Sequence, residues 1–95
     1  MAGKRVDDNH GEIVAALRRV GAEVQSLASM GGGVPDLLAA FRGDWYVIEV
    51  KDGNKPPSKR KLTPDEEKWH AKFSHVAPVH IVNTVDEALT AIGAI

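Results

Sequence analysis

A short turn between two strand-like segments constrains the fold of this chain more than any other feature of its sequence. Residues 35–41 and 45–51 are rich in apolar, aromatic and β-branched side chains, and Arg42-Gly43 lies between them. A two-residue loop at Arg42-Gly43 and a four-residue loop around it set the same antiparallel register, in which Asp36 lies opposite Glu49. The sequence therefore predicts a β-hairpin that brings two carboxylates to one face of a sheet.

The other segments complete an α/β domain. Helices are expected from Asp8 or Asn9 to about Arg19, after Thr63-Pro64 and after Thr84, and further strands over 23–28 and 78–82. Trp69, Phe73 and Val76 recur at helical spacing, and Trp69 and Phe73 are predicted to lie in the core. The predicted order is α-β-β-β-α-β-α, with a mixed four-stranded sheet flanked by helices. Because the 95 residues contain neither an internal repeat nor a linker, residues 1–95 are expected to form one domain.

The composition excludes several classes of protein. The chain has no cysteine, which rules out disulfide bonds and thiolate metal sites. Its longest apolar runs, residues 13–17 and 37–41, hold five residues each, far fewer than the roughly 20 that span a bilayer. Lys4 and Arg5 precede no hydrophobic stretch, so no secretory signal is expected. We therefore expect a cytoplasmic protein that does not associate with membranes.

Asp36, Glu49 and Lys51 are expected to converge at the edge of the predicted sheet. Side chains alternate along a strand, so Lys51 points to the same side as Glu49. Two opposed carboxylates destabilise a sheet unless a cation holds them. A pair of oxygen ligands completed by water and phosphate suits Mg²⁺ (or Mn²⁺) rather than Zn²⁺. Alternatively, the register slips by one or two residues and all three are ordinary surface charges.

The motifs around these residues resemble those of a known nuclease superfamily. Gly33-Val34-Pro35-Asp36, followed thirteen residues after the aspartate by Glu49-Val50-Lys51, is similar to the PD-(D/E)XK signature. More narrowly, the chain resembles the stand-alone virus-type replication-repair nuclease (VRR-NUC) domains of phages and bacteria. The matching features are Glu12-Ile13-Val14, Pro35-Asp36-Leu37-Leu38, Glu49-Val50-Lys51 and Leu62-Thr63-Pro64. The resemblance covers about residues 9–92.

This resemblance implies a restriction-endonuclease-like core and a hydrolase acting on ester bonds, namely a metal-dependent DNA endonuclease. It implies that Asp36, Glu49 and the Val50 carbonyl bind the metal, and that Glu12 reaches the same site directly or through water. Lys51 then orients the attacking water or stabilises charge on the phosphorane. It further implies a homodimer that acts on branched DNA in replication, repair or recombination, as a Holliday-junction resolvase does.

Two glutamates have alternative interpretations. The family usually has glutamine where this chain has Glu66, which could assist the site or complete a Thr63-Pro64-Asp65-Glu66 capping box. Glu12 lies three residues after Asn9, which also fits a capping box. Because of Glu66, a non-catalytic DNA-binding or replication-accessory module on a degenerate nuclease fold is the main alternative function. A protein-interaction domain with a surface acidic cluster is a further alternative.

Contacts with DNA are expected from a basic loop and a glycine-rich turn. Lys55, Lys59, Arg60 and Lys61 can bind phosphate, although such a run is equally typical of a solvated loop. Gly32 and Gly33 allow close approach to DNA or a sharp turn before the strand. No Lys-Ser/Thr pair follows these glycines, so a nucleotide cofactor is not expected. The four histidines lack cysteine partners and metal-ligand spacing, so no zinc site is predicted.

Overall fold

The computed structural model describes residues 8–95 and confirms the predicted order of elements. They are α1 (His10–Arg19), β1 (Glu23–Ser26), β2 (Leu37–Phe41), β3 (Asp44–Val50), the 3-10 turn η1 (Pro57–Lys59), α2 (Pro64–Phe73), β4 (His80–Val82) and α3 (Val85–Ala91). Lys4 and Arg5, on which the expected lack of a secretory signal depends, lie outside the described residues. Within residues 8–95, none of the helices has the length and apolar character needed to cross a bilayer.

The four strands form one mixed sheet in the order β1-β2-β3-β4. The β1–β2 and β2–β3 pairs are antiparallel, whereas β3 and β4 run parallel. Arg42 and Gly43 have φ angles of 49° and 91°, the left-handed geometry of a tight hairpin turn. Phe41 pairs with Asp44, and Leu37 pairs with Ile48. If this register is continued by one residue, Asp36 lies opposite Glu49. The predicted hairpin register is confirmed.

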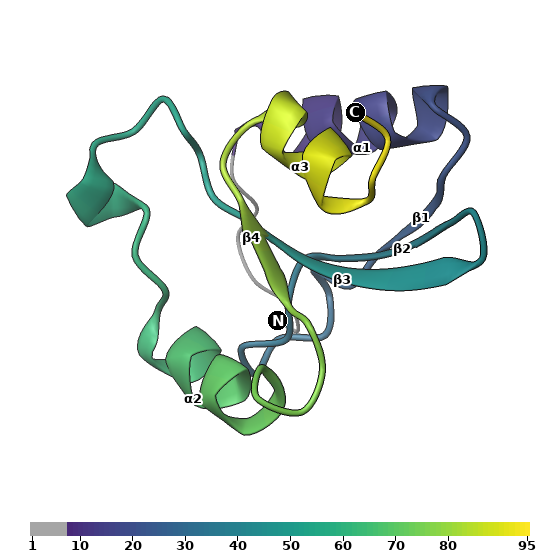
Figure 1. Cartoon of the computed structure of the whole chain (residues 1–95). Helices are drawn as coiled ribbons and strands as arrows, with labels where there is room; N and C mark the ends of the chain where they lie inside the picture. Colours follow the sequence, from purple (N-terminus) through teal and green to yellow (C-terminus); the bar gives the residue numbers. More distant parts are fainter. Residues whose placement is uncertain (1–7) are drawn as a thin grey trace.

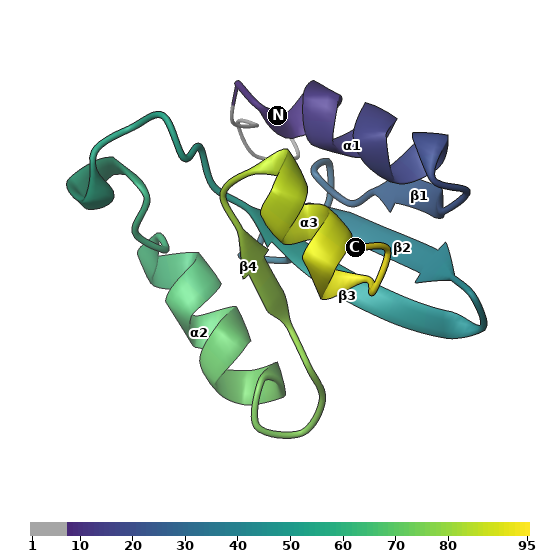
Figure 2. The same ribbon diagram turned by 45° about the horizontal axis from the view of Figure 1, so that its top comes forward.

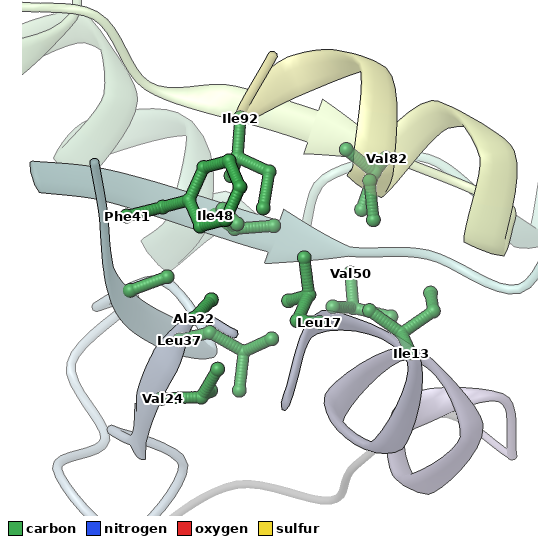
Figure 3. Close-up of a cluster of buried hydrophobic side chains, with 12 residues drawn as sticks. Ile13, Leu17, Ala22, Val24, Leu37, Phe41, Ile48, Val50, Val82 and Ile92 are labelled. Carbon is green, nitrogen blue, oxygen red and sulfur yellow. The ribbon is translucent and has the colours of Figure 1, made fainter. Parts of the chain in front are cut away.

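The apolar core lies on the face of the sheet that α1 and α3 cover (Figures 1 and 2). Ile13 and Leu17 of α1 point toward the buried side chains of β2 and β3, and Ile92 approaches from the end of α3 (Figure 3). The buried strand residues in this core include Leu37, Ala39, Phe41, Ile48, Val50 and Val82. Residues on the opposite side of each strand are thereby left facing away from the core.

The second helix does not pack as the sequence predicts. β4 lies between α2 and α3 in both views, and α2 stands apart from the α1–α3 layer (Figures 1 and 2). Trp69 is half-buried and Phe73 is 40% exposed, so their predicted core position is wrong. Val76, which is expected on the same helix, lies beyond the end of α2 and is 77% exposed. The buried residues of α2 are Glu66 and His70. This helix turns a polar face inward because the side chains it meets from the end of β3 are charged.

Candidate active site

Asp36, Glu49 and Lys51 meet where β2 and β3 stop pairing. Ile48 and Val50 point into the core, so the alternation of side chains turns Glu49 and Lys51 toward α2. Asp36 lies just before β2, and its Oδ2 accepts a hydrogen bond of 2.7 Å from the backbone N–H of Val50. The exposed fractions of Asp36, Glu49 and Lys51 are 3%, 1% and 7%. The structure therefore brings the three predicted residues together and buries them.

Glu66 serves as a helix cap and as the partner of Lys51 at the same time. Thr63 Oγ1 accepts a hydrogen bond from the Glu66 N–H, and Glu66 Oε1 accepts one of 2.9 Å from the Thr63 N–H. This predicted capping box fixes the start of α2. The same Oε1 lies 2.7 Å from Lys51 Nζ in a buried ion pair. Glu66 therefore completes the predicted capping box and contacts Lys51 in one arrangement, because a carboxylate oxygen accepts more than one hydrogen bond.

His70 is a residue of this site that the sequence analysis missed. It follows Glu66 by one helical turn, and its Nε2 lies 3.2 Å from Glu49 Oε1. The Trp69 ring meets the His70 ring nearly edge-on, with centroids 5.9 Å apart. The spacing of a zinc site, which would single out a histidine in the sequence, does not occur around His70. The spacing of four residues from Glu66, which places both side chains on one helix face, is the signal that identifies His70.

Gly33 does not lie on an open surface, because it packs closely against the backbone of Asp65 and Glu66. It is buried and has a φ of +81°. A Cβ atom at this position would lie only 2.1 Å from the Asp65 carbonyl oxygen. Gly33 therefore sets the distance between the turn before Asp36 and the first turn of α2. This position does not support the DNA contact expected of Gly33, whereas Gly32 is exposed.

Glu12 does not join the carboxylate pair. Ile13 and Leu17 form the buried stripe of α1, which leaves Glu12 exposed on another side of the helix. There it lines a pocket with Asn9 and residues 53–54 and 83–86. Within the part of the chain that the structure describes, no three acidic or histidine side chains form a cluster that can hold a metal ion. Glu12 therefore does not form one group of direct ligands with Asp36 and Glu49, and its role through a bridging water stays a prediction.

Asn9 fixes the start of α1 through contacts that the sequence did not indicate. It occupies the predicted N-cap position, but its side chain makes no capping hydrogen bond. Instead, Nδ2 donates to the carbonyl oxygens of Lys51 and Asn83, both at 3.0 Å. The predicted capping box between Asn9 and Glu12 is therefore absent. The side chain of Asn9 ties α1 to the ends of β3 and β4, next to the candidate site.

The basic loop extends from the end of β3 to the start of α2. It forms an arm that leads away from the sheet and returns to α2 (Figure 1). Lys59 and Lys61 are exposed along it, whereas Lys55 and Arg60 are half-buried. The N–H of Gly53 donates to the Asn83 carbonyl at 3.0 Å and anchors the near end of the loop. Its exposed lysines are thus held on a segment that begins two residues after Lys51.

The charges of the site fit a divalent cation. Asp36, Glu49 and Glu66 contribute three buried carboxylates, of which Glu66 is paired with the Lys51 ammonium and Glu49 lies beside His70. Buried like charges are strongly unfavourable unless further positive charge accompanies them. Mg²⁺ needs one or two protein carboxylates, with water and phosphate oxygens completing its shell. Asp36 and Glu49 are therefore two buried carboxylates of the kind that Mg²⁺ takes as ligands, with water and phosphate oxygens supplying the rest of its shell.

One solved structure shares the fold of this chain. No family model matches the sequence, and no curated protein matches it. A solved structure described as a VRR-NUC domain is similar to this chain, with a TM-score of 0.59 and 27% sequence identity. The alignment covers 88% of this chain and 94% of the solved one. It therefore spans nearly the whole of both folds.

Proposed function

Since this chain has the VRR-NUC fold of a nuclease-family domain, we propose that it is a divalent-metal-dependent DNA endonuclease. The observation that carries the proposal is the burial of Asp36, just before β2, and of Glu49 and Lys51 at the end of β3, with the Asp36 carboxylate 2.7 Å from the backbone nitrogen of Val50. A protein that used these charges only for solubility would leave them in water, because burying them costs several kcal/mol each, to order of magnitude. Their burial together is typical of a site that binds a cation.

Each residue has a distinct part in the proposed hydrolysis. Asp36, Glu49 and the Val50 carbonyl hold the metal. A bound divalent cation supplies a water nucleophile at neutral pH and neutralises charge on the scissile phosphate. Lys51 stabilises the negative charge that develops on the phosphate oxygens. Glu66 holds the Lys51 ammonium in place through the 2.7 Å ion pair.

We propose branched DNA as the substrate and a homodimer as the active form. The net charge is −1, and five of the twelve basic residues lie between Lys51 and Lys61. One protomer thus presents few positive groups to DNA, and each phosphate neutralised adds a limited, salt-sensitive contribution to affinity. Two copies related by a two-fold axis double those contacts and place one site on each of two strands.

The proposal is tested by cleavage of a labelled four-way junction and its matched linear duplex with Mg²⁺, Mn²⁺ or EDTA. We expect metal-dependent cutting of the junction. The matched variant is Asp36→Asn, because asparagine keeps an oxygen that accepts from the Val50 N–H but loses the charge that holds a cation. Its cleavage at limiting metal is expected to fall about 100-fold. Equal cutting of both DNAs would discard the junction preference, and no cutting by the wild-type protein in either metal would contradict the endonuclease.

The second candidate is a DNA-binding module that has lost catalysis. The observation that favours it is Glu66, a charged partner that holds Lys51 where the family usually has glutamine. On this alternative, the protein binds the junction with or without metal and leaves it intact. The interaction-domain alternative has no metal site at all.

Thermal unfolding separates the interaction-domain alternative from the other two. A metal that binds only the native state stabilises it, by about 1.4 kcal/mol at ten times its Kd. For a domain of this size we expect the Tm to rise by roughly 5–10 °C, and the rise to be much smaller in Asp36→Asn. An unchanged Tm in millimolar Mg²⁺ and Mn²⁺ would mean that the carboxylates do not hold a cation.

A further inference from the structure

His70 places a ring nitrogen beside one of the carboxylates proposed to hold the metal. Its Nε2 lies 3.2 Å from Glu49 Oε1, and the two side chains are 9% and 1% exposed. A carboxylate that binds a cation is ionised and only accepts hydrogen bonds, so in the proposed metal-binding state the hydrogen between the two atoms belongs to Nε2. In that state His70 is the donor to Glu49, whether its ring is neutral or protonated.

The imidazole ring is held in this position from several sides. The capping box fixes the start of α2, and the ion pair between Glu66 and Lys51 ties its first turn to the end of β3. One turn later, the Trp69 ring packs against His70 at an interplanar angle of 71°. Trp69 is in turn stacked on Phe73, with centroids 4.2 Å apart. The aromatic pair that does not enter the core thus supports the histidine.

We propose that His70 is a positioning residue of the metal site, whose Nε2–H holds the Glu49 carboxylate in the orientation that binds the cation. The inference rests on the proposed function. A glutamate side chain has three rotatable bonds, and ordering it costs conformational entropy. Hydrogen bonds from neighbouring groups orient the carboxylates that ligate metals, and their loss typically lowers metal affinity about 10–100-fold. Glu49 receives such a bond from His70, as Asp36 does from the Val50 N–H.

The test is calorimetric titration of the full chain with Mn²⁺ in the absence of DNA. His70→Leu removes the donor and is expected to lower Mn²⁺ affinity about 10–100-fold. His70→Gln keeps an N–H at nearly the same reach and is expected to retain affinity within about threefold. Equal affinity of His70→Leu and the wild type would overturn the proposal. An equal loss in both variants would also overturn it, because His70 would then be a nitrogen ligand of the metal.

Two controls keep this test independent of folding and of the proposed function. Thermal unfolding without metal shows whether each variant is folded. If His70→Leu does not fold, Trp69→Leu removes only the ring that supports His70. A smaller loss of Mn²⁺ affinity is expected in that variant, and unchanged affinity overturns the proposal. Failure of the wild type to bind Mn²⁺ and to cut DNA would refute the nuclease itself, whereas unchanged binding by His70→Leu beside an active wild type would refute only the role of His70.

Discussion

Gly33→Ala is expected to lower the free energy of unfolding by about 2–5 kcal/mol. The glycine has a φ of +81°, and an L-residue in this region costs roughly 1–2 kcal/mol. The new Cβ would also lie 2.1 Å from the Asp65 carbonyl oxygen and 2.8 Å from the Glu66 nitrogen. These are backbone atoms of the first turn of α2, so relief requires the helix to move, at a further cost of about 1–3 kcal/mol.

Gly32→Ala is the matched control for this prediction. Gly32 has a φ of +63° but no atom within 4 Å of the added Cβ, so its substitution carries only the backbone cost of about 1–2 kcal/mol. Urea unfolding of both variants isolates the contribution of packing against α2. Equal stabilities would contradict the close packing of Gly33. Because displacement of α2 also moves Glu66 and His70, folded Gly33→Ala is expected to bind Mn²⁺ more weakly than folded Gly32→Ala.

The sequence predicts the hairpin and the convergence of three site residues because those features depend on local rules. A tight turn at Arg42-Gly43 determines the register, and the register places Asp36 beside Glu49. Strand alternation then places Lys51 on the same face. The capping box at Thr63 is likewise set by residues close in sequence.

The orientation of α2 is not predictable in the same way. Helical spacing shows that Trp69 and Phe73 lie on the same side of the helix. It does not show whether that side packs against the sheet or faces away from it. Here α1 and α3 take the apolar face, and α2 packs against charged groups. The side of α2 that becomes buried is therefore polar, and it contains His70, which the sequence did not single out. The position of Glu12 relative to Asp36 and Glu49 is also set by tertiary packing, which helical spacing alone does not determine.

Lys51→Ala is expected to have the largest effect on cleavage, with a loss of about 10³-fold or more. Removing a group that stabilises charge in the transition state typically costs about 10²–10³-fold. The substitution also leaves Glu66 buried without its 2.7 Å partner, and breaking a buried ion pair costs roughly 3–5 kcal/mol. Loss of activity in this variant therefore combines a chemical effect with a folding effect.

The double variant Lys51→Met/Glu66→Gln separates these two effects. It removes both charges together, so most of the lost stability is expected to return, while cleavage stays about 10²–10³-fold below the wild type. Glu66→Gln alone keeps an oxygen that accepts from Lys51 Nζ and from the Thr63 N–H. We expect that variant to fold and to cleave within about tenfold of the wild type, a change of roughly 1.4 kcal/mol in the barrier. Urea unfolding and single-turnover cleavage of all four proteins complete the comparison. If the double variant cleaved DNA at the wild-type rate, a catalytic role for Lys51 would be contradicted. The only defect of Lys51→Ala would then be the buried, unpaired charge of Glu66.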